Sequence, residues 1–167
     1  CIDPSKTSGK DFVMVLAHGP GPSSTDSLHG GCFDPAFGTN NLLSLDISKA
    51  VWMSMSCGGG HLKLKSSTSG SIPMTFLKNG GAIYVGSTDL NYGGLGGGCG
   101  VFGGDNCIGS LYAEIAKRYQ TGKRIGDSYV EGKIYYFNHY GCVAGRSYQT
   151  HINCFYGDPT LKIKSVW

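Results

Sequence analysis

The sequence predicts an α/β fold built on a mostly parallel sheet, and two apolar runs carry that prediction. Asp11–Ala17 and Ala50–Ser56 are continuous apolar segments, and each leads into one polar residue followed by glycine. Short runs that do not alternate suit strands that are buried on both faces, as in parallel sheets. Segments with helical spacing alternate with such runs along the chain, which is typical of α/β proteins.

The first part of the chain divides into a tail, a strand, a long loop and a second strand. Residues 1–10 are polar and contain proline and glycine, so we expect an N-terminal tail or processing site there, with one domain over residues 11–167. The segment from Gly19 to Asn41 is expected to be loop, because proline and glycine alternate at its start. Leu42–Ile47 is expected to form a helical turn before the strand at Ala50–Ser56.

The later elements follow from helical spacing and from the positions of proline and glycine. Proline in a first turn and glycine beyond the last turn indicate one short helix, and apolar residues at helical spacing indicate two longer ones. Gly126 and Gly132 weaken the last of these helices. The predicted order is a helix at Ser71–Gly81, a strand at Ala82–Gly86, helices at Ile108–Tyr119 and Ile125–Asn138, and a terminal strand or hairpin over Asn153–Asp158 and Leu161–Ile163.

The predicted sheet lacks a βαβ unit before its first strand. A doubly wound sheet normally has one there, and ten polar residues cannot supply it. The chain also begins abruptly at Cys1. We therefore expect the sheet to be completed by strands of another chain or of an upstream segment of the same precursor.

Composition excludes several classes of function. The net charge of +3 is small and scattered, so we expect no nucleic-acid partner. No run approaches the roughly 20 apolar residues that a membrane span requires. Seven cysteines and 28 glycines in 167 residues fit a protein with many tight turns in an oxidising compartment. We expect an extracellular or cell-envelope location.

Because the number of cysteines is odd, one of them must remain a thiol if the other six form disulfides. Cys57 is the best candidate for that thiol because it follows a predicted strand. Cys99 with Cys107, and Cys142 with Cys154, would close short loops, although six cysteines allow fifteen pairings. Metal binding is the competing explanation, but no CxxC pair or zinc-type spacing occurs. We expect no metal site.

Cys57 and His18 each stand just beyond a predicted strand. If the two strands are parallel neighbours, both residues emerge at the same edge of the sheet, where ligands of α/β proteins bind. A cysteine beside a histidine is a nucleophile with its base. Cys57 could instead be a buried or disulfide-bonded residue, and His18 a histidine bonded to a backbone carbonyl. His29 is the reserve candidate for the base, although no strand-like run precedes it.

Several motifs together resemble the gingipain-type cysteine peptidases, relatives of caspases and legumains. They are the apolar runs ending in His18-Gly19 and Ser56-Cys57-Gly58, the strand Gly81–Thr88, and the late segments Arg124–Tyr129 and Phe155–Leu161. The resemblance covers roughly residues 11–164. It implies a caspase-like three-layer α/β sandwich and a Cys/His dyad that needs no metal.

The resemblance also implies roles for individual residues. Cys57 would attack the peptide carbonyl, and His18 would protonate the leaving amine before water releases the acyl-enzyme. The backbone amides of Gly19 and Cys57 would form the oxyanion hole, because backbone donors stabilise the developing negative charge. No cofactor is expected, and a structural calcium ion stays compatible with the sequence.

Substrate binding is expected at Thr88, Asp89 and Tyr92, which follow the third predicted strand. Asp89 could pair with a basic side chain of a peptide substrate, or it could be an ordinary turn residue. The cysteine-rich composition and the family resemblance together predict a secreted cysteine endopeptidase. The alternative is an extracellular structural or adhesive subunit of the same fold that is inactive or only processes itself. A sugar-binding module that uses the tyrosines is a third interpretation.

Overall fold

The computed structural model describes residues 4–15, 17, 27–30, 33–62, 71–89, 108–140 and 150–162. The chain divides into two compact units. Unit 1 comprises Cys1–Asn91 and Ile152–Gly157, and unit 2 comprises Tyr92–His151 and Asp158–Trp167. Each unit is described by itself below.

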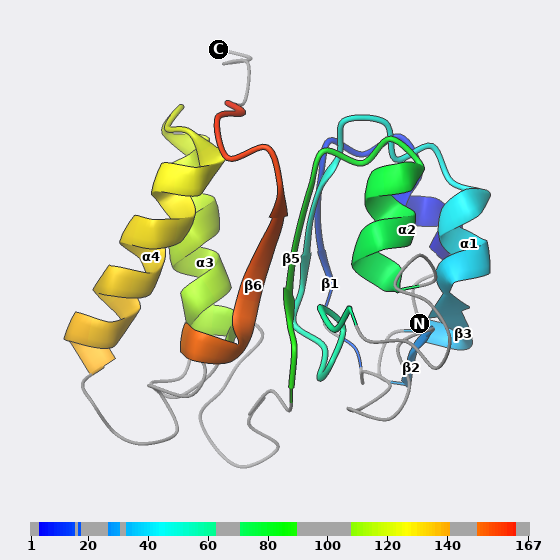
Figure 1. Ribbon diagram of the computed structural model, residues 1–167, viewed down its shortest axis with the longest axis horizontal. Coiled ribbons are helices and arrows are strands. Elements are labelled where there is room, and N and C mark those ends of the chain that lie inside the picture. Colours follow the sequence, from blue (N-terminus) through cyan, green and yellow to red (C-terminus); the bar gives the residue numbers. More distant parts are fainter. Residues whose placement is uncertain are drawn as a thin grey trace. The chain divides into compact units, whose positions relative to one another are not determined.

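A four-stranded sheet forms the centre of unit 1 (Figure 1). Its strands are β1 (Phe12–Val15), β4 (Val51–Ser54), β5 (Ile83–Ser87) and β6 (Asn153–Gly157), and they lie in the order β1-β4-β5-β6. β1, β4 and β5 are parallel, and β6 is antiparallel to β5. This confirms the predicted α/β class, the mostly parallel sheet and the position of every strand in it.

The central strands are the most buried part of unit 1. Every residue of β4 and β5 is buried, which explains why their sequences run apolar without alternation. α1 (Thr39–Leu43) and α2 (Ile72–Lys78) pack on the sheet. The ring of Phe76 in α2 lies 5.7 Å from those of both Trp52 and Tyr84, centroid to centroid. Such aromatic contacts add to the free energy of burial.

α2 begins and ends as its sequence predicts. The Ser71 hydroxyl accepts a hydrogen bond from the Met74 amide at 3.4 Å, and Pro73 lies in the first turn. A serine cap satisfies one of the amides that a helix N-terminus leaves without a partner, and proline removes another. The helix ends at Lys78, before Gly80 and Gly81.

The prediction of loop from Gly19 to Asn41 is wrong for its second half. β2 (Ser27–Gly30) and β3 (Phe33–Gly38) form a separate antiparallel two-stranded sheet with an irregularity between Leu28 and Gly30. α1 then begins at Thr39, three residues earlier than the predicted helical turn. Short irregular strands carry little periodicity, and their stability comes from a pairing that local sequence does not reveal.

The described part of the predicted tail is packed against the body of unit 1. Pro4–Thr7 form the 3-10 helix η1, and Thr7 is buried. The Gly9 amide donates to the Asp46 carbonyl at 2.7 Å, and the Asp46 amide donates to the Ser8 hydroxyl at 2.9 Å. Ser8 and Gly9, which follow η1, therefore hold the turn before β4 through hydrogen bonds to the Asp46 backbone.

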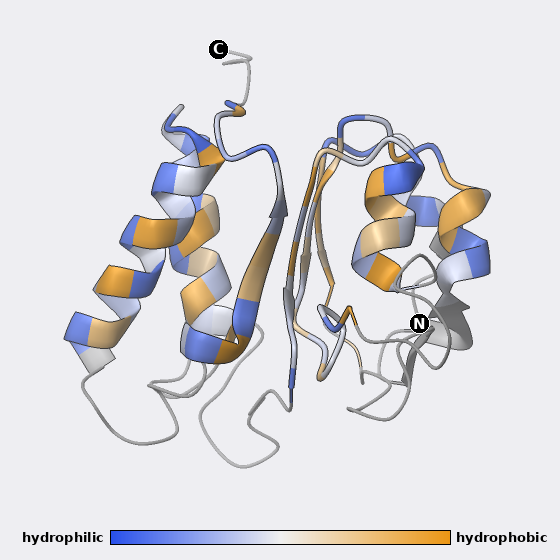
Figure 2. Ribbon diagram, in the orientation of Figure 1, coloured by the Kyte–Doolittle hydropathy of each residue, from blue (hydrophilic) through white to orange (hydrophobic). Residues whose placement is uncertain are grey.

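Unit 2 contains a helical hairpin of α3 (Ile108–Gln120) and α4 (Ile125–Tyr140), as predicted. A Cβ atom at Gly132 would lie 2.7 Å from Cγ1 of Ile115, so the glycine lets the two helices approach closely. Figure 2 shows hydrophobic and hydrophilic residues alternating along α4. Of the predicted segment Leu161–Ile163, the structure describes Leu161 and Lys162, and these form no strand: Lys162 makes one isolated bridge with Arg124.

The start of α4 is held by the segment that follows β6. The Ile125 and Gly126 amides donate to the carbonyls of Leu161 and Pro159 at 2.9 and 3.0 Å. These contacts satisfy two of the amides that the first turn of a helix exposes. They explain why the late Asp-Pro-Thr-Leu sequence accompanies this helix.

Candidate active site

Cys57 lies on a tight turn directly after β4. The turn covers residues 57–60, and the Cys57 side chain is half-buried. Gly58 has a φ of +63°, in the left-handed region that L side chains rarely adopt. A residue with a side chain at position 58 would be strained, so the glycine after Cys57 is required by the backbone.

The amides that follow Cys57 are all engaged. Gly58 donates to the Asp89 carbonyl at 2.9 Å, and Gly60 donates to the Ser87 carbonyl at 2.7 Å. Two further bonds lie inside the turn: Gly59 donates to Ser56 at 3.2 Å and His61 to Gly58 at 3.0 Å. These four amides are therefore already committed to backbone carbonyls.

The turn also presses against the end of β5. A Cβ atom at Gly60 would lie 2.4 Å from the Gly86 carbonyl oxygen, and one at Gly86 would lie 3.0 Å from Cα of Gly60. Both positions exclude a side chain because backbone meets backbone there. This contact gives a physical reason for glycine at both ends of the interface.

Three of the predicted site residues, His18, Gly19 and Tyr92, lie outside the described residues. The described strand that leads to His18 is β1, and its register with β4 pairs Val15 with Ser54. His18 and Cys57 each follow that pair by three residues. The reserve candidate, His29, lies in β2, which belongs to the two-stranded sheet and not to the sheet that carries Cys57.

Thr88 and Asp89 follow β5, beside the Cys57 turn. Both the amide and the hydroxyl of Thr88 donate to the Ile152 carbonyl, at 2.8 and 3.0 Å, so Thr88 links β5 to the residue before β6. The Asp89 carbonyl accepts bonds from the Gly58 amide and, at 2.8 Å, from the Ser87 hydroxyl. The backbone of Asp89 is therefore in direct contact with the turn that carries Cys57.

The cysteine predictions have mixed outcomes. Cys57 is a thiol, as predicted. Cys154, in β6, is a thiol as well, so the predicted pairing with Cys142 is wrong. Loop length alone suggested that pairing, and loop length does not determine which residues of a β-sheet meet. Cys142 and the other four cysteines lie outside the described residues.

Sequence reasoning missed two tyrosines that contact the Cys57 turn. The Tyr84 hydroxyl donates to the Gly59 carbonyl at 2.8 Å, and the Tyr156 hydroxyl donates to the Gly60 carbonyl at 2.5 Å. Tyr84 lies in β5 and Tyr156 in β6, and the two are direct partners in the antiparallel register. No local pattern relates Tyr156 to a turn 96 residues earlier.

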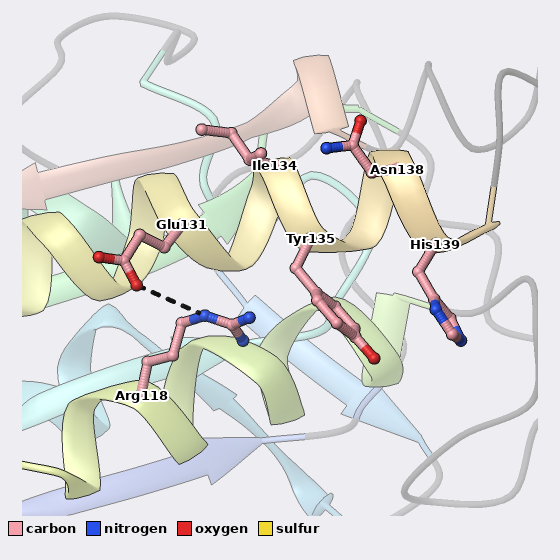
Figure 3. A pocket seen from close by; sticks show the side chains of 6 residues that line it. All are labelled: Arg118, Glu131, Ile134, Tyr135, Asn138 and His139. Carbon is pink, nitrogen blue, oxygen red and sulfur yellow. Dashed lines mark ion pairs between the residues drawn. The ribbon is translucent and has the colours of Figure 1, made fainter.

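A pocket of about 440 Å³ lies along α4 in unit 2, and Figure 3 shows its lining. The Arg118 guanidinium lies 4.8 Å from the centroid of the Tyr135 ring, which stacks on His139 at 5.1 Å. Nε of Arg118 is also 3.7 Å from a carboxylate oxygen of Glu131. The described residues of its lining include no cysteine or serine nucleophile of the kind that the predicted chemistry needs.

The chain belongs to peptidase family C25: a family model of that description matches residues 4–164. This confirms the resemblance to the gingipain-type cysteine peptidases, because that family is the gingipain family. A search of curated proteins found no match. Membership supports cysteine peptidase activity on protein substrates.

Two further findings concern the helices and the candidate metal ligands of the described residues. None of their helices combines the length and hydrophobicity that crossing a membrane requires. Within the same ranges, His, Cys, Asp and Glu do not gather in groups of three or more that could hold a metal ion.

Proposed function

We propose that this chain is the catalytic portion of a secreted cysteine endopeptidase in which Cys57 is the nucleophile and His18 is the general acid and base. The observation that carries the proposal is the β1–β4 register, because Cys57 and His18 stand three residues beyond the paired residues Ser54 and Val15. Adjacent strands are about 4.8 Å apart. We expect two side chains that leave neighbouring parallel strands at equal distances to lie near each other at one edge of the sheet.

The proposed reaction is acyl transfer in two steps. The Cys57 thiolate attacks the peptide carbonyl, and the Gly19 and Cys57 amides stabilise the oxyanion. The His18 imidazolium then gives its proton to the departing amine, which leaves a thioester on Cys57. Water attacks the thioester while His18 accepts a proton from it, and the carboxylic acid product and the thiolate are released. This reaction uses no cofactor.

The turn after Cys57 supports this assignment chemically. A left-handed glycine and a backbone contact with β5 hold the cysteine at the end of a strand instead of inside the core. The half-buried thiol remains accessible in part. An imidazolium beside a cysteine favours the thiolate, which is the form that attacks a carbonyl.

The test compares the wild-type chain with Cys57→Ala, His18→Ala and the matched control His29→Ala. Hydrolysis of a quenched fluorescent peptide library should be lost in the first two variants, by at least about 1,000-fold, and retained in the third. Iodoacetamide should alkylate Cys57 of the wild type faster than a free model thiol, and His18→Ala should remove that advantage.

Two results would overturn the proposal. One is an active Cys57→Ala variant, and the other is a wild type that is inactive with a Cys57 no more reactive than a model thiol. The second result would favour the structural or adhesive subunit that the sequence leaves as the alternative.

We also propose that Thr88, Asp89 and Tyr92 border the substrate-binding site and that a further strand pairs with β1. Asp89 supports the first part because its backbone bonds to the turn of Cys57. The second part is supported by the position of β1 at the end of the sheet in the described part of the chain. That strand would come from a partner chain or from another segment of the same precursor.

A further inference from the structure

The two tyrosine hydroxyls that contact the Cys57 turn act on consecutive peptide units. Tyr84 binds the carbonyl of Gly59, and Tyr156 binds the carbonyl of Gly60. Both rings belong to the core side of the sheet: Tyr84 is fully buried, and Tyr156 packs against the same cluster. Their rings are 6.5 Å apart, centroid to centroid.

The hydroxyls complete a set of bonds on the glycine turn. The amides of Gly58 and Gly60 donate to the carbonyls of Asp89, just after β5, and of Ser87, at its end. The carbonyls of Gly59 and Gly60 accept hydrogen bonds from the two tyrosines. Three consecutive glycines would otherwise give this turn unusually large backbone freedom. A turn whose amides and carbonyls are both hydrogen-bonded keeps one conformation despite its three glycines.

We propose that Tyr84 and Tyr156 are positioning residues that hold the turn after Cys57, and thereby the Cys57 thiol and amide, in the geometry that catalysis requires. This proposal rests on the proposed function, because it takes Cys57 as the nucleophile. Neither tyrosine touches the substrate in this scheme. Each acts through the backbone of the glycine turn.

The two hydroxyls differ in how much the fold depends on them. Tyr84 is completely buried, so loss of its hydroxyl leaves the Gly59 carbonyl without its donor in the core. Tyr156 is half-buried, so water can replace its hydroxyl more easily. Tyr156→Phe is therefore the cleaner test, and Tyr84→Phe is the second variant.

The experiment measures kcat and KM on the peptide substrate that the wild type cleaves best, and the rate at which iodoacetamide alkylates Cys57. Tyr156→Phe keeps the ring and removes one bond to the turn. A displacement of a reacting group by about 1 Å can lower a rate about 100-fold. We expect kcat to fall about 10- to 100-fold with KM within about twofold, and alkylation to slow in parallel.

Tyr129→Phe is the matched control. Tyr129 is also half-buried, and its hydroxyl accepts a hydrogen bond from Lys133 at 3.0 Å within α4. This variant should match the wild type in kcat and in alkylation. Thermal unfolding of each variant establishes that it is folded at the assay temperature.

The outcomes separate this proposal from the proposed function. Wild-type activity that depends on Cys57, together with an unchanged kcat in Tyr156→Phe and Tyr84→Phe, overturns the positioning role and leaves the peptidase intact. A higher KM at constant kcat overturns it as well, since the hydroxyl would then serve substrate binding. If neither variant folds, the hydroxyls serve the fold as a whole and the proposal fails. An inactive wild type refutes the proposed function itself.

Discussion

Tyr84 combines a core position with an ionisable group that contacts the candidate active site. Burial raises the pKa of Tyr84 well above its usual range, and a hydrogen bond with Ser54 opposes that shift in part. The hydroxyl therefore stays protonated near neutral pH and can donate to the Gly59 carbonyl. A phenolate there could not make this bond.

This shift predicts how stability depends on alkaline pH. Because the pKa is higher in the folded state, the unfolded chain loses its proton first as pH rises through about 10, and stability then falls. The loss from this residue approaches about 1.4 kcal/mol per pH unit. Urea unfolding between pH 8 and 11 measures it, and Tyr84→Phe should show a shallower decline. Parallel curves for the two proteins would contradict the prediction.

The proposed position of Asp89 at the substrate-binding site predicts a preference for substrates with basic side chains. Asp89→Asn removes the charge while the backbone contact with Gly58 can persist, so binding of a basic side chain should weaken without displacing Cys57. We expect kcat/KM to fall about 10- to 100-fold for peptides with lysine or arginine before the cleaved bond. Cleavage after uncharged residues should change little.

The control for Asp89 is Asp46→Asn, which removes an exposed carboxylate from the loop before β4. It changes the net charge equally. An equal loss in both variants, or an equal loss for basic and uncharged substrates, would show that Asp89 does not select the substrate.

At the level of elements, the helical hairpin shows why a glycine that weakens a helix is retained. Gly132 costs about 1 kcal/mol of helix propensity relative to alanine. However, a Cβ atom there would lie 2.7 Å from Cγ1 of Ile115 and 3.2 Å from its Cα atom, so the packing of α3 against α4 excludes it. The free energy gained by close packing of the two helices therefore exceeds the cost of glycine in helix propensity.

Gly132→Ala is therefore expected to lower the free energy of unfolding by about 1–3 kcal/mol, although the substitution favours an isolated helix. Chemical denaturation measures this change. In an Ile115→Ala background, which removes Cγ1, the same substitution should cost less, and the double-mutant cycle gives the coupling. A stabilising Gly132→Ala variant would show that propensity outweighs packing.

For the molecule as a whole, the proposed partner strand makes a prediction about the edge of β1 that faces away from β4. The carbonyls of Asp11 and Val15 accept bonds from Val51 and Met55 of the β4 segment. Backbone groups alternate in direction along a parallel strand. Met14 therefore directs its amide and carbonyl away from β4, toward the side where the proposed partner strand would add.

Hydrogen exchange tests this proposal. If a strand pairs with β1 in the native protein, the Met14 amide should exchange about as slowly as the Val13 amide, which faces β4. The chain expressed alone should show faster exchange at Met14 and unchanged exchange at Val13. Fast exchange at Met14 in the protein isolated from its source would contradict the partner strand.

Sequence patterns alone predicted the α/β class, the four strands of the sheet, the three longest helices and the relationship to gingipain-type peptidases. They succeeded because continuous apolar runs and helical spacing are local consequences of burial, and because His-Gly and Ser-Cys-Gly follow such runs. The β2–β3 hairpin, the state of Cys154 and the tyrosine contacts with the Cys57 turn could not be read in this way.

Those features depend on which distant segments meet. Tyr156 contacts Gly60 only because β6 pairs with β5 in one register, and a shift of one residue would turn its side chain to the other face. Likewise, Gly60 excludes a side chain because Gly86 is beside it in the fold and not in the chain. Burial makes each strand recognisable by itself, whereas pairing between strands is a property of the folded whole.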